Sequence, residues 1–269
     1  MKLANRVAVV TGAGGGIGRA TALALARRGC HLALADIDGT AAADAAREAR
    51  ALGVRVSSHR LDVADRLGVR LLPAEVLEVH GRVDLVVNNA GVALGGSFEQ
   101  VIEDDFDWLM EINFHGVVRM TRAFLPHLRL SDDARIVNVS SIYGIVSPPG
   151  QSAYSASKFA VRGFSNALRH ELEGSPVAVS VVHPGGVATS IAKNARVPDG
   201  APQDEIDRGR AVAQRLLRMP PDRAGEIIAQ GIERRQARIL VGGDARFVAL
   251  LERLIPVHYW KLLKKATGR

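Results

Sequence analysis

The chain has 269 residues, of which 47% are hydrophobic and 23% charged, and its formal net charge is +7. These values are close to the average for globular proteins, so they exclude a disordered chain and a coiled coil. The single cysteine, Cys30, excludes an intrachain disulfide and a cysteine-based metal cluster.

The first half of the chain alternates between short apolar, β-branched runs and stretches with helical spacing. We expect strands at 6–11, 31–36, 54–61 and 83–88. Helices are expected at 19–28, 40–52 and 65–80, the last of them irregular near Pro73. A helix follows each of the first three strands, which is the order of βαβ units.

The second half continues the alternation. Long helices are expected at 103–128 and 152–173, and strands at 135–140, 177–182 and 238–241. A mixed region at 183–210 precedes shorter helices at 211–217 and 222–235. The pattern predicts an α/β fold: one Rossmann-type doubly wound domain with a seven-stranded, mostly parallel sheet and helices on both faces. No repeat or linker divides the chain.

The apolar run at the N-terminus is short and ends in a glycine-rich turn, so we expect no signal peptide. No segment has the roughly 18 uncharged apolar residues of a membrane-spanning helix. We therefore expect a cytoplasmic protein. The eight histidines lack the spacing of metal ligands, so no metal is expected.

The segment from Thr11 to Gly18 reads TGAGGGIG and lies between the first predicted strand and the first helix. Glycines let the backbone turn tightly and approach a pyrophosphate, and the N-terminus of the helix supplies free N–H groups. An acid, Asp36, follows at the end of the second strand. A carboxylate there accepts hydrogen bonds from ribose hydroxyls and repels a 2′-phosphate, so we expect NAD in preference to NADP.

A second group of residues points to proton transfer. Tyr154 and Lys158 are four residues apart on a predicted helix, so their side chains share one face. We expect the ammonium of Lys158 to lower the pKa of the Tyr154 phenol and so make it a usable general acid/base. Ser141, thirteen residues before Tyr154, can donate a hydrogen bond to a substrate oxygen.

These motifs, in this order, make the chain resemble the short-chain dehydrogenase/reductase family from Val7 to about Val241. The resemblance also draws on Asp62-Val63, Asn88 to Gly91, Asn113, and Pro184-Gly185 with Thr189. It implies hydride transfer between a nicotinamide and an alcohol or ketone, with the catalytic set Asn113, Ser141, Tyr154 and Lys158. Asn113 would position a water that connects Lys158 to solvent. Alternatively, Asn113 only caps or kinks its helix, and Asp62 is only a turn residue at the end of a strand.

The resemblance further implies which residues line the cofactor. They are Gly12, Gly14, Gly16, Ile17, Gly18, Asp36, Asp62, Val63, Asn89, Ala90, Gly91, Tyr154, Lys158, Pro184, Gly185, Val187 and Thr189. The expected substrate pocket is apolar and includes Ile142, Tyr143, Val146, Pro149 and Ile191. Residues 188–210 are expected to form a mobile lid over it. The family usually assembles through its long helices, which implies a homodimer or homotetramer.

Residues 245–269 form a basic, amphipathic C-terminal extension. From 246 to 269 six basic side chains stand against Glu252 alone: Arg246, Arg253, Lys261, Lys264, Lys265 and Arg269. This segment could cover the pocket, pack on a subunit or touch an anionic membrane. A solvated face explains its charge better than nucleic-acid binding does. Two other functions remain open, an NADP-dependent carbonyl reductase and a non-catalytic dinucleotide-sensing protein.

Overall fold

Seven parallel strands form one sheet in the order β3-β2-β1-β4-β5-β6-β7. The computed structural model describes residues 1–266, and the side chains of residues 1–264. The strands are β1 (Val7–Thr11), β2 (His31–Asp36), β3 (Val56–Arg60), β4 (Leu85–Asn88), β5 (Ala134–Val139), β6 (Val177–Pro184) and β7 (Arg238–Val241). The strand order reverses between β1 and β4, which is where open α/β sheets place their ligands.

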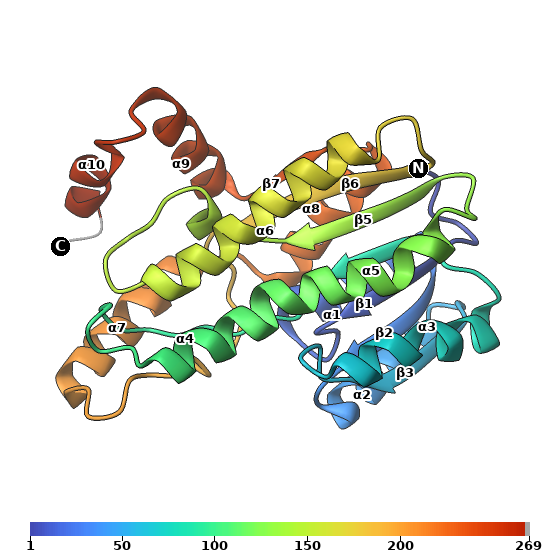
Figure 1. Cartoon of the computed structure of the whole chain (residues 1–269), viewed down its shortest axis with the longest axis horizontal. Coiled ribbons are helices and arrows are strands. Elements are labelled where there is room, and N and C mark those ends of the chain that lie inside the picture. Colours follow the sequence, from blue (N-terminus) through green and yellow to red (C-terminus); the bar gives the residue numbers. More distant parts are fainter. Residues whose placement is uncertain (267–269) are drawn as a thin grey trace.

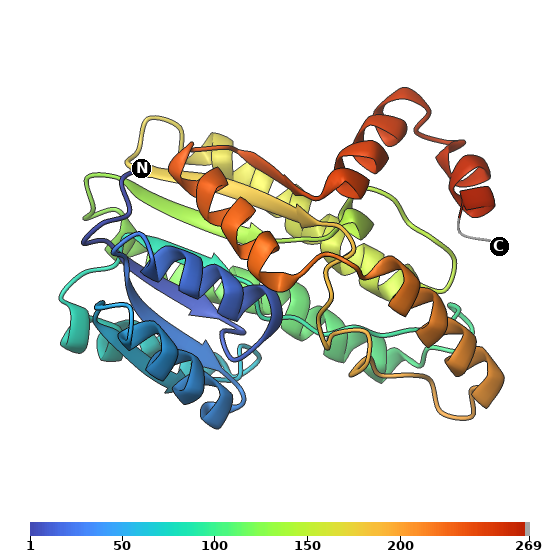
Figure 2. The same ribbon diagram turned by 180° about the vertical axis from the view of Figure 1, so that it is seen from behind.

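Helices cover both faces of the sheet. They are α1 (Gly16–Ala26), α2 (Gly39–Arg50), α3 (Arg66–His80), α4 (Glu103–Met110), α5 (Gly116–Leu128), α6 (Ser152–Glu171), α7 (Gln203–Leu216), α8 (Pro221–Glu233), α9 (Gly243–Leu254) and α10 (Tyr259–Ala266). The helices α3, α5 and α6 lie on the face seen in Figure 1. The view from behind in Figure 2 shows α1, α2 and α8 on the other face, where α1 packs on α8.

The central strands are buried on both sides. Every residue of β1, β4 and β5 is buried. The sheet separates two apolar cores, one under α1 and α8 and one under α3, α5 and α6. Full burial of one Val or Leu side chain contributes about 1.5–3 kcal/mol, so these two layers hold the sheet rigid. This burial explains why the strands read as continuous Val/Ile/Leu runs.

The predicted fold class is confirmed, with differences in three segments. The helix α3 continues through Pro73, so the expected irregularity does not interrupt it. The expected long helix at 103–128 is divided into α4 and α5 by a π-helical turn, η1 (Glu111–His115). The helix α7 begins at Gln203, well before the predicted start at 211, because none of its residues is buried and its first two turns are mostly polar or charged.

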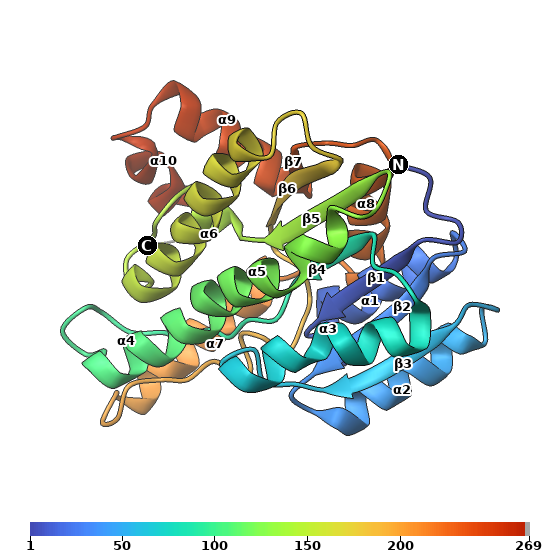
Figure 3. The same ribbon diagram turned by 45° about the vertical axis from the view of Figure 1, so that its right-hand side comes forward.

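The carboxyl ends of all the strands face the same side of the molecule. Figure 3 shows β1 and β5 pointing in the same direction, towards the side where α4 and α7 lie. The loops that follow β1, β4, β5 and β6 therefore meet at this edge of the sheet. It is the edge at which the sequence motifs lie.

Candidate active site

The loop after β1 brings its glycines against the first turn of α1. Gly12 and Gly16 have φ angles of 62° and 52°, in the left-handed region that favours glycine. A Cβ at Gly18 would overlap the carbonyl oxygen of Gly12, so the first turn of α1 packs directly against the glycine loop. A Cβ at Gly15 would meet no atom within 4 Å. The N-terminus of α1 is thus open towards the carboxyl edge of the sheet. Ile17 points the other way and packs against the core.

The loop after β4 fixes the glycine loop from the side. The amide of Asn89 donates to the carbonyl oxygens of Thr11 (3.0 Å) and Gly12 (3.1 Å). In return, Thr11 Oγ1 accepts from the backbone N–H groups of Asn89 (3.0 Å) and Ala90 (3.1 Å). These four hydrogen bonds hold the two loops as one unit. Asn89 and Ala90 therefore hold the glycine loop in place beside the predicted cofactor site.

The carboxylate of Asp36 is tied to the glycine loop. It accepts from the N–H groups of Gly14 (2.8 Å) and Asp38 (3.0 Å). The structure also places Arg60, on β3, in register with Asp36 on β2. Sequence analysis did not single out this arginine, because the pairing of β2 with β3 is invisible in a sequence. Asp36 and Arg60 therefore lie side by side at the ends of neighbouring strands.

Asp62 and Val63 follow β3 and have different surroundings. Asp62 is exposed, and its Oδ1 accepts from the N–H of Ala64 at 2.8 Å, which is the turn role left open above. Val63 is buried, and a Cβ at Gly116 would lie 2.8 Å from its Cγ2. Val63 thus lies against the start of α5.

The loop after β6 contacts the glycine loop. A Cβ at Gly16 would lie 3.1 Å from Cγ2 of Thr189, so the two loops are in contact. Pro184 is the last residue of β6, and Val187 pairs with Met219 in an isolated bridge. The N–H of Gly186 donates to Asp244 Oδ2 at 2.6 Å, and Asp244 lies in the first turn of α9. Sequence analysis missed Asp244, whose role depends on the contact between α9 and this loop.

These loops fit a dinucleotide. The backbone of the glycine loop is accessible at the N-terminus of α1, an acid lies beside it, and Thr189 borders it from the loop after β6. Free N–H groups at a helix N-terminus bind phosphate oxygens, and a carboxylate at the end of β2 binds a ribose. The residues present therefore suit the nicotinamide dinucleotide that the sequence implies.

Tyr154, Lys158 and Ser141 meet at the carboxyl end of β5. Tyr154 and Lys158 lie on the first turns of α6, and Lys158 Nζ is 5.6 Å from the centre of the Tyr154 ring. Ser141 follows β5, and its Oγ accepts from the N–H of Tyr143 at 3.1 Å. Tyr143 packs edge-on against Tyr154, with ring centres 6.1 Å apart. The expected grouping of a hydroxyl, a phenol and an ammonium is thus present in one place.

The pKa of Tyr154 departs from expectation. Burial raises it to about 12, the negative charge that Tyr143 can carry also raises it, and a hydrogen bond from Ser141 opposes both. Burial likewise lowers the pKa of Lys158 to about 8. In the protein without cofactor, burial is thus the largest influence on the Tyr154 pKa, and the lowering by Lys158 stays a prediction.

Two neighbouring serines have different partners. Ser140 Oγ donates to the carbonyl oxygen of Lys158 at 2.8 Å and is buried, so it holds β5 to α6. Ser141 is partly exposed and faces Tyr154. The ring of His183 donates from Nδ1 to the carbonyl oxygen of Ser141 at 2.9 Å, while its buried Nε2 has no partner among the described residues. Sequence analysis did not single out His183, since it reads as part of a buried strand.

Asn113 lies in the π turn and is fully buried. Its Oδ1 accepts from the N–H of Val92 at 2.8 Å, and its Nδ2 donates to the Val92 carbonyl oxygen at 3.0 Å. A Cβ at Gly91 would lie 3.0 Å from Asn113 Oδ1 and 3.3 Å from Lys158 Nζ. Gly91 therefore lies between the asparagine and the lysine, and a side chain at this position would fill the space between them.

The residues predicted to line the substrate pocket have mixed surroundings. Ile142, Tyr143 and Ile191 are partly buried, and Pro149 is exposed. Val146 packs with Ile145, α9 and α10 in a small apolar cluster. A further apolar cluster contacts Tyr154 and was missed, because it combines a loop without a periodic pattern with residues of α4 and α6. It consists of Val92, Leu94, Val101, Phe106, Trp108, Leu109 and Ala153.

The segment at 188–210 contacts this apolar cluster at one point. The guanidinium of Arg196 lies 3.6 Å from the centre of the Trp108 ring, and its Nη1 donates to Asp105 at 2.6 Å. The backbone of Arg196 exchanges hydrogen bonds with Ala93 and Gly95. The predicted lid is thus joined to the loop after β4, and α7 follows it.

The C-terminal helices contact the loop that carries Val146. The hydroxyl of Tyr259 accepts from the N–H of Ser147 at 3.0 Å, and Tyr259 and Leu263 pack on Ile145 and Val146. The outer side of α9 leaves Phe247, Leu250 and Leu254 exposed. Among the described residues, no helix combines the length and apolar character needed to cross a membrane.

The arrangement of loops, tyrosine and lysine at this sheet edge defines an oxidoreductase that binds a nicotinamide dinucleotide. The short chain dehydrogenase family model matches residues 6–199. The chain belongs to the short-chain dehydrogenase/reductase family.

Individual proteins show the same likeness over most of the chain. The oxidoreductase SadH of Mycobacterium tuberculosis is 45% identical over 268 residues, covering 98% of this chain and 96% of that protein. A short-chain dehydrogenase/reductase from Burkholderia phymatum, solved in complex with NAD, superposes with a TM-score of 0.87 at 32% identity and covers 94% of this chain and 95% of its own. An alcohol dehydrogenase from Thermococcus sibiricus, complexed with 5-hydroxy-NADP, has a TM-score of 0.74 at 29% identity and covers 88% and 94%.

Proposed function

We propose that the chain interconverts an apolar alcohol and the corresponding ketone with NAD(H), and that Tyr154 moves the proton at the substrate oxygen. The observation that carries this proposal is the meeting of Tyr154, Ser141 and Lys158 at the carboxyl end of β5. The apolar cluster beside Tyr154 supports an apolar substrate. A bound nicotinamide would supply hydride acceptance or donation at the substrate carbon.

The residues of the chain would divide the remaining work. Ser141 Oγ would donate a hydrogen bond to the substrate oxygen and hold it beside the Tyr154 hydroxyl. In reduction Tyr154 gives its proton to that oxygen, and in oxidation it takes the proton away. Lys158 would bind the nicotinamide ribose and favour the phenolate when charged. Asn113 and Gly91 border Lys158 on the side where a water could pass the proton to solvent.

The raised pKa of Tyr154 gives the two directions different pH dependences. Oxidation needs the phenolate, so its rate should rise with pH as the phenol ionises. Reduction needs the phenol, which burial keeps protonated at neutral pH, so its rate should fall only in alkaline solution. The positive charge of a bound oxidised nicotinamide would lower the Tyr154 pKa from its value in the protein alone.

Absorbance at 340 nm tests the reaction with NAD or NADP and a panel of secondary alcohols, steroids, retinol and long-chain alcohols. Tyr154→Phe is expected to lower kcat by about a hundred- to ten-thousand-fold, the usual contribution of a general acid/base. Tyr143→Phe is the matched control, because it removes the same hydroxyl from the neighbouring ring and should cost no more than about tenfold. Equal losses in both variants would overturn the assignment of Tyr154.

We also propose NAD as the preferred cofactor, because the carboxylate of Asp36 lies where a 2′-phosphate would approach Gly14. Arg60, in register with Asp36, is the group that would favour NADP instead. Binding of NADH and NADPH, followed by fluorescence, separates the two. Wild type should bind NADH at least about tenfold more tightly, and Asp36→Asn should narrow that ratio. Tighter NADPH binding that Arg60→Gln abolishes would reverse the preference.

The number of subunits and the cellular location of the protein remain predictions. We propose a homodimer or homotetramer in the cytoplasm, on the family resemblance and the long helices α5 and α6. Light scattering of the purified protein would give the number of subunits.

A further inference from the structure

Large apolar side chains are concentrated on the surface of the C-terminal helices. Phe247, Leu250 and Leu254 of α9 are 60%, 56% and 68% exposed, and Val257, which follows α9, is 80% exposed. We call these four residues the C-terminal apolar face. Single exposed apolar residues are ordinary on a protein surface, whereas several that lie together mark a site of interaction. Figure 1 shows α9 and α10 at the periphery of the molecule, so a partner can reach them.

Two sides of α9 are apolar. The inner side carries Val248 and Ala249, which are buried. Phe247, Leu250 and Leu254 follow one another at spacings of three and four residues, so they share the outer side. A helix on the surface of a globular protein normally has one apolar side and turns a polar side outwards. The outer side of α9 departs from that pattern and has the composition of a surface that a partner covers.

Basic side chains border the C-terminal apolar face. Arg246 and Arg253 are exposed and lie seven residues apart, so they occupy one flank of α9. Neither side chain forms a hydrogen bond or an ion pair with another described residue. Lys261 of α10 is exposed as well. Lys265 and Arg269 lie outside the residues whose side chains are described.

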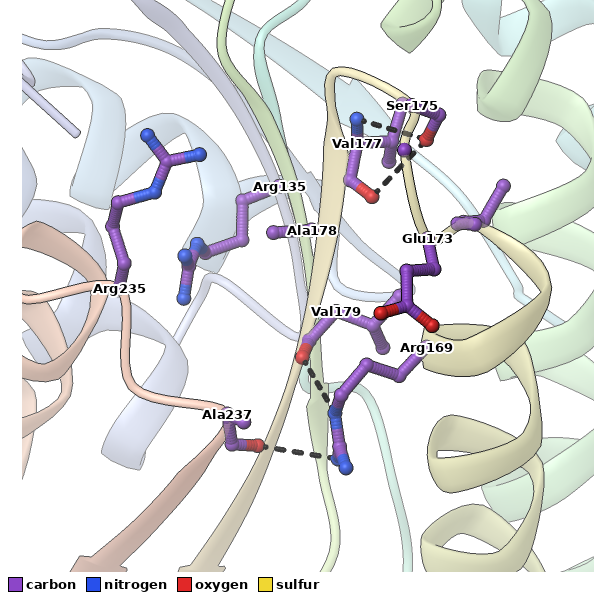
Figure 4. Close-up of a pocket in the computed structure, with 11 residues that line it drawn as sticks. Arg135, Arg169, Glu173, Ser175, Val177, Ala178, Val179, Arg235 and Ala237 are labelled. Carbon is purple, nitrogen blue, oxygen red and sulfur yellow. Dashed lines mark hydrogen bonds between the residues drawn. The ribbon is translucent and has the colours of Figure 1, made fainter.

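Arginines at the amino edge of the sheet differ from those of α9. Figure 4 shows a cavity there, with Arg135 and Arg169 on opposite sides of β6. Arg135 donates to Ser180 Oγ at 2.7 Å, and Arg169 donates to the carbonyl oxygen of Val179 at 3.3 Å. Their guanidinium groups are thus engaged within the chain, whereas the two arginines of α9 remain available to an external anion.

The acidic residues of α9 are directed towards the body of the molecule. Asp244 accepts from the N–H of Gly186 at 2.6 Å, and Glu252 lies close enough to Arg238 of β7 to stabilise its charge. These two are the only acids in residues 243–264. A second copy docked by two-fold symmetry would bring the same cations together, which is unfavourable. A surface of negative charge is the complementary partner.

We propose that the C-terminal apolar face docks on an anionic lipid bilayer. An interfacial helix inserts apolar side chains at the boundary between headgroups and acyl chains, and its basic residues contact lipid phosphates. Leu250 and Leu254 supply the apolar part, and Arg246 and Arg253 supply the charge. This docking does not depend on the oxidoreductase reaction. Because α10 packs on Val146, a docked chain would hold the proposed substrate pocket near a phase that dissolves apolar alcohols.

Cosedimentation of the full chain with vesicles tests the proposal. Vesicles of phosphatidylcholine alone are compared with vesicles that also contain roughly 30% phosphatidylglycerol. The partition coefficient should be at least about tenfold higher for the anionic vesicles at low salt, and it should fall as added salt screens the charges. Binding to neither kind of vesicle would overturn the proposal. Equal binding to both kinds would also overturn it, because the cations would then have no role.

Matched variants make the test specific to the C-terminal apolar face. Leu254→Asn should lower the partition coefficient by about tenfold, because it removes an exposed apolar side chain. Leu130→Asn is its control, since Leu130 is 85% exposed but precedes β5 at the amino edge of the sheet. Arg253→Gln should weaken binding to anionic vesicles about fivefold, with Arg70→Gln on α3 as the control. Equal losses in a variant and its control would contradict docking by this face.

Light scattering separates a bilayer from a second copy as the partner. An unchanged molecular mass of Leu254→Asn, together with its loss of vesicle binding, would support the bilayer. A lower mass for Leu254→Asn and no vesicle binding by the wild type would show that a second copy covers the face, and would overturn the proposal. Vesicle binding is measured without turnover, so failure of the proposed reaction would leave this test unaffected.

Discussion

The two edges of the sheet hold buried polar groups in contrasting ways. At the amino edge, beside the start of β4, the carboxylate of Asp84 accepts from Arg6 (3.1 Å), Arg82 (2.5 Å), Ser131 (2.6 Å) and the N–H of Val7 (2.9 Å). At the carboxyl edge the buried ammonium of Lys158 has one carbonyl oxygen, that of Val139, at 3.3 Å.

This difference indicates that the amino edge contributes to stability, whereas the carboxyl edge retains the groups of the proposed reaction. Burial alone would raise the pKa of Asp84, yet the hydrogen bonds from Arg82, Ser131 and Val7 lower it, so the charge is satisfied in the folded state. Lys158 has no such compensation, and burial lowers its pKa to about 8. Groups that are buried without full pairing cost stability, and functional sites are where such groups are retained.

The largest effect should come from Lys158→Met. Activity should fall by about a hundred- to ten-thousand-fold, while the free energy of unfolding at neutral pH should rise by up to about 3 kcal/mol, the equivalent of the lowered pKa. The sign follows from the shift: a lysine with a depressed folded pKa penalises folding below about pH 8, and the penalty fades as pH rises towards 10.5.

Urea unfolding at pH 7 and at pH 10 measures this change beside the 340 nm assay. The gain in stability should be smaller at pH 10. A variant that loses both activity and stability would show that Lys158 is a structural residue, and the contrast between the two edges would not hold.

The opposite result is expected at the amino edge, where Asp84→Asn should destabilise the fold by about 3–5 kcal/mol. The pKa of Asp84 is depressed, so its contribution is present above about pH 4 and is lost as pH falls further. Urea unfolding between pH 3 and pH 7 measures both the loss and its pH dependence. Asp132→Asn is the matched control, because that carboxylate is exposed and its loss should change stability far less.

Two buried histidines should make the stability of the fold depend on pH in the mildly acidic range. Burial lowers the pKa of His80 and of His183 to about 4, so the unfolded chain takes up protons first as pH falls from about 6.5. Stability should therefore decrease between pH 6.5 and pH 5, by about 2 kcal/mol for each histidine. His183→Gln should remove roughly half of the slope, and exposed His258→Gln none of it. A flat profile in the wild type would contradict the assignment.

The smallest effect concerns the C-terminal helices. Tyr259→Phe removes the acceptor for the N–H of Ser147 and should cost about 0.5–1.5 kcal/mol of local stability. Because this hydrogen bond holds α10 on the loop beside the proposed substrate pocket, KM for the proposed alcohol substrate should rise by about two- to tenfold while KM for the cofactor stays constant. Steady-state kinetics with each substrate varied in turn measures the two KM values separately. Equal changes in both constants would argue against a role at the substrate end.

Much of this structure could be predicted because its signals are local. The buried strands read as continuous apolar runs, and the predictions for β2 and β7 match the observed bounds at both ends. The glycine loop and the spacing of Tyr154 and Lys158 predicted the grouping found at the carboxyl edge. The helix α7 was predicted to start too late, because its first two turns are mostly polar or charged and resemble a loop in sequence.

Other features depend on contacts between distant segments, which no local pattern reveals. The raised pKa of Tyr154 results from burial by segments distant in sequence, including the loops after β4 and β5, whereas the sequence suggested only its helical neighbour Lys158. Arg60 comes into register with Asp36 through strand pairing, and Arg135 is buried because small residues of β6 leave room for it. The part of the apolar cluster beside Tyr154 that runs from Val92 to Val101 lies in a loop without hydrophobic periodicity.

The π turn between α4 and α5 has a consequence for chain length. A π turn contains one residue more than an α-helical turn, and here it holds Asn113 against Val92. Deleting one residue from Glu111–His115 would restore a continuous α-helix with α4 and α5 in nearly the same relative orientation, because the wider π turn has already absorbed the extra residue. Leu109 and Met120, both fully buried, would keep facing their cores. A single-residue deletion should thus cost little packing and should act mainly by moving Asn113 away from Val92.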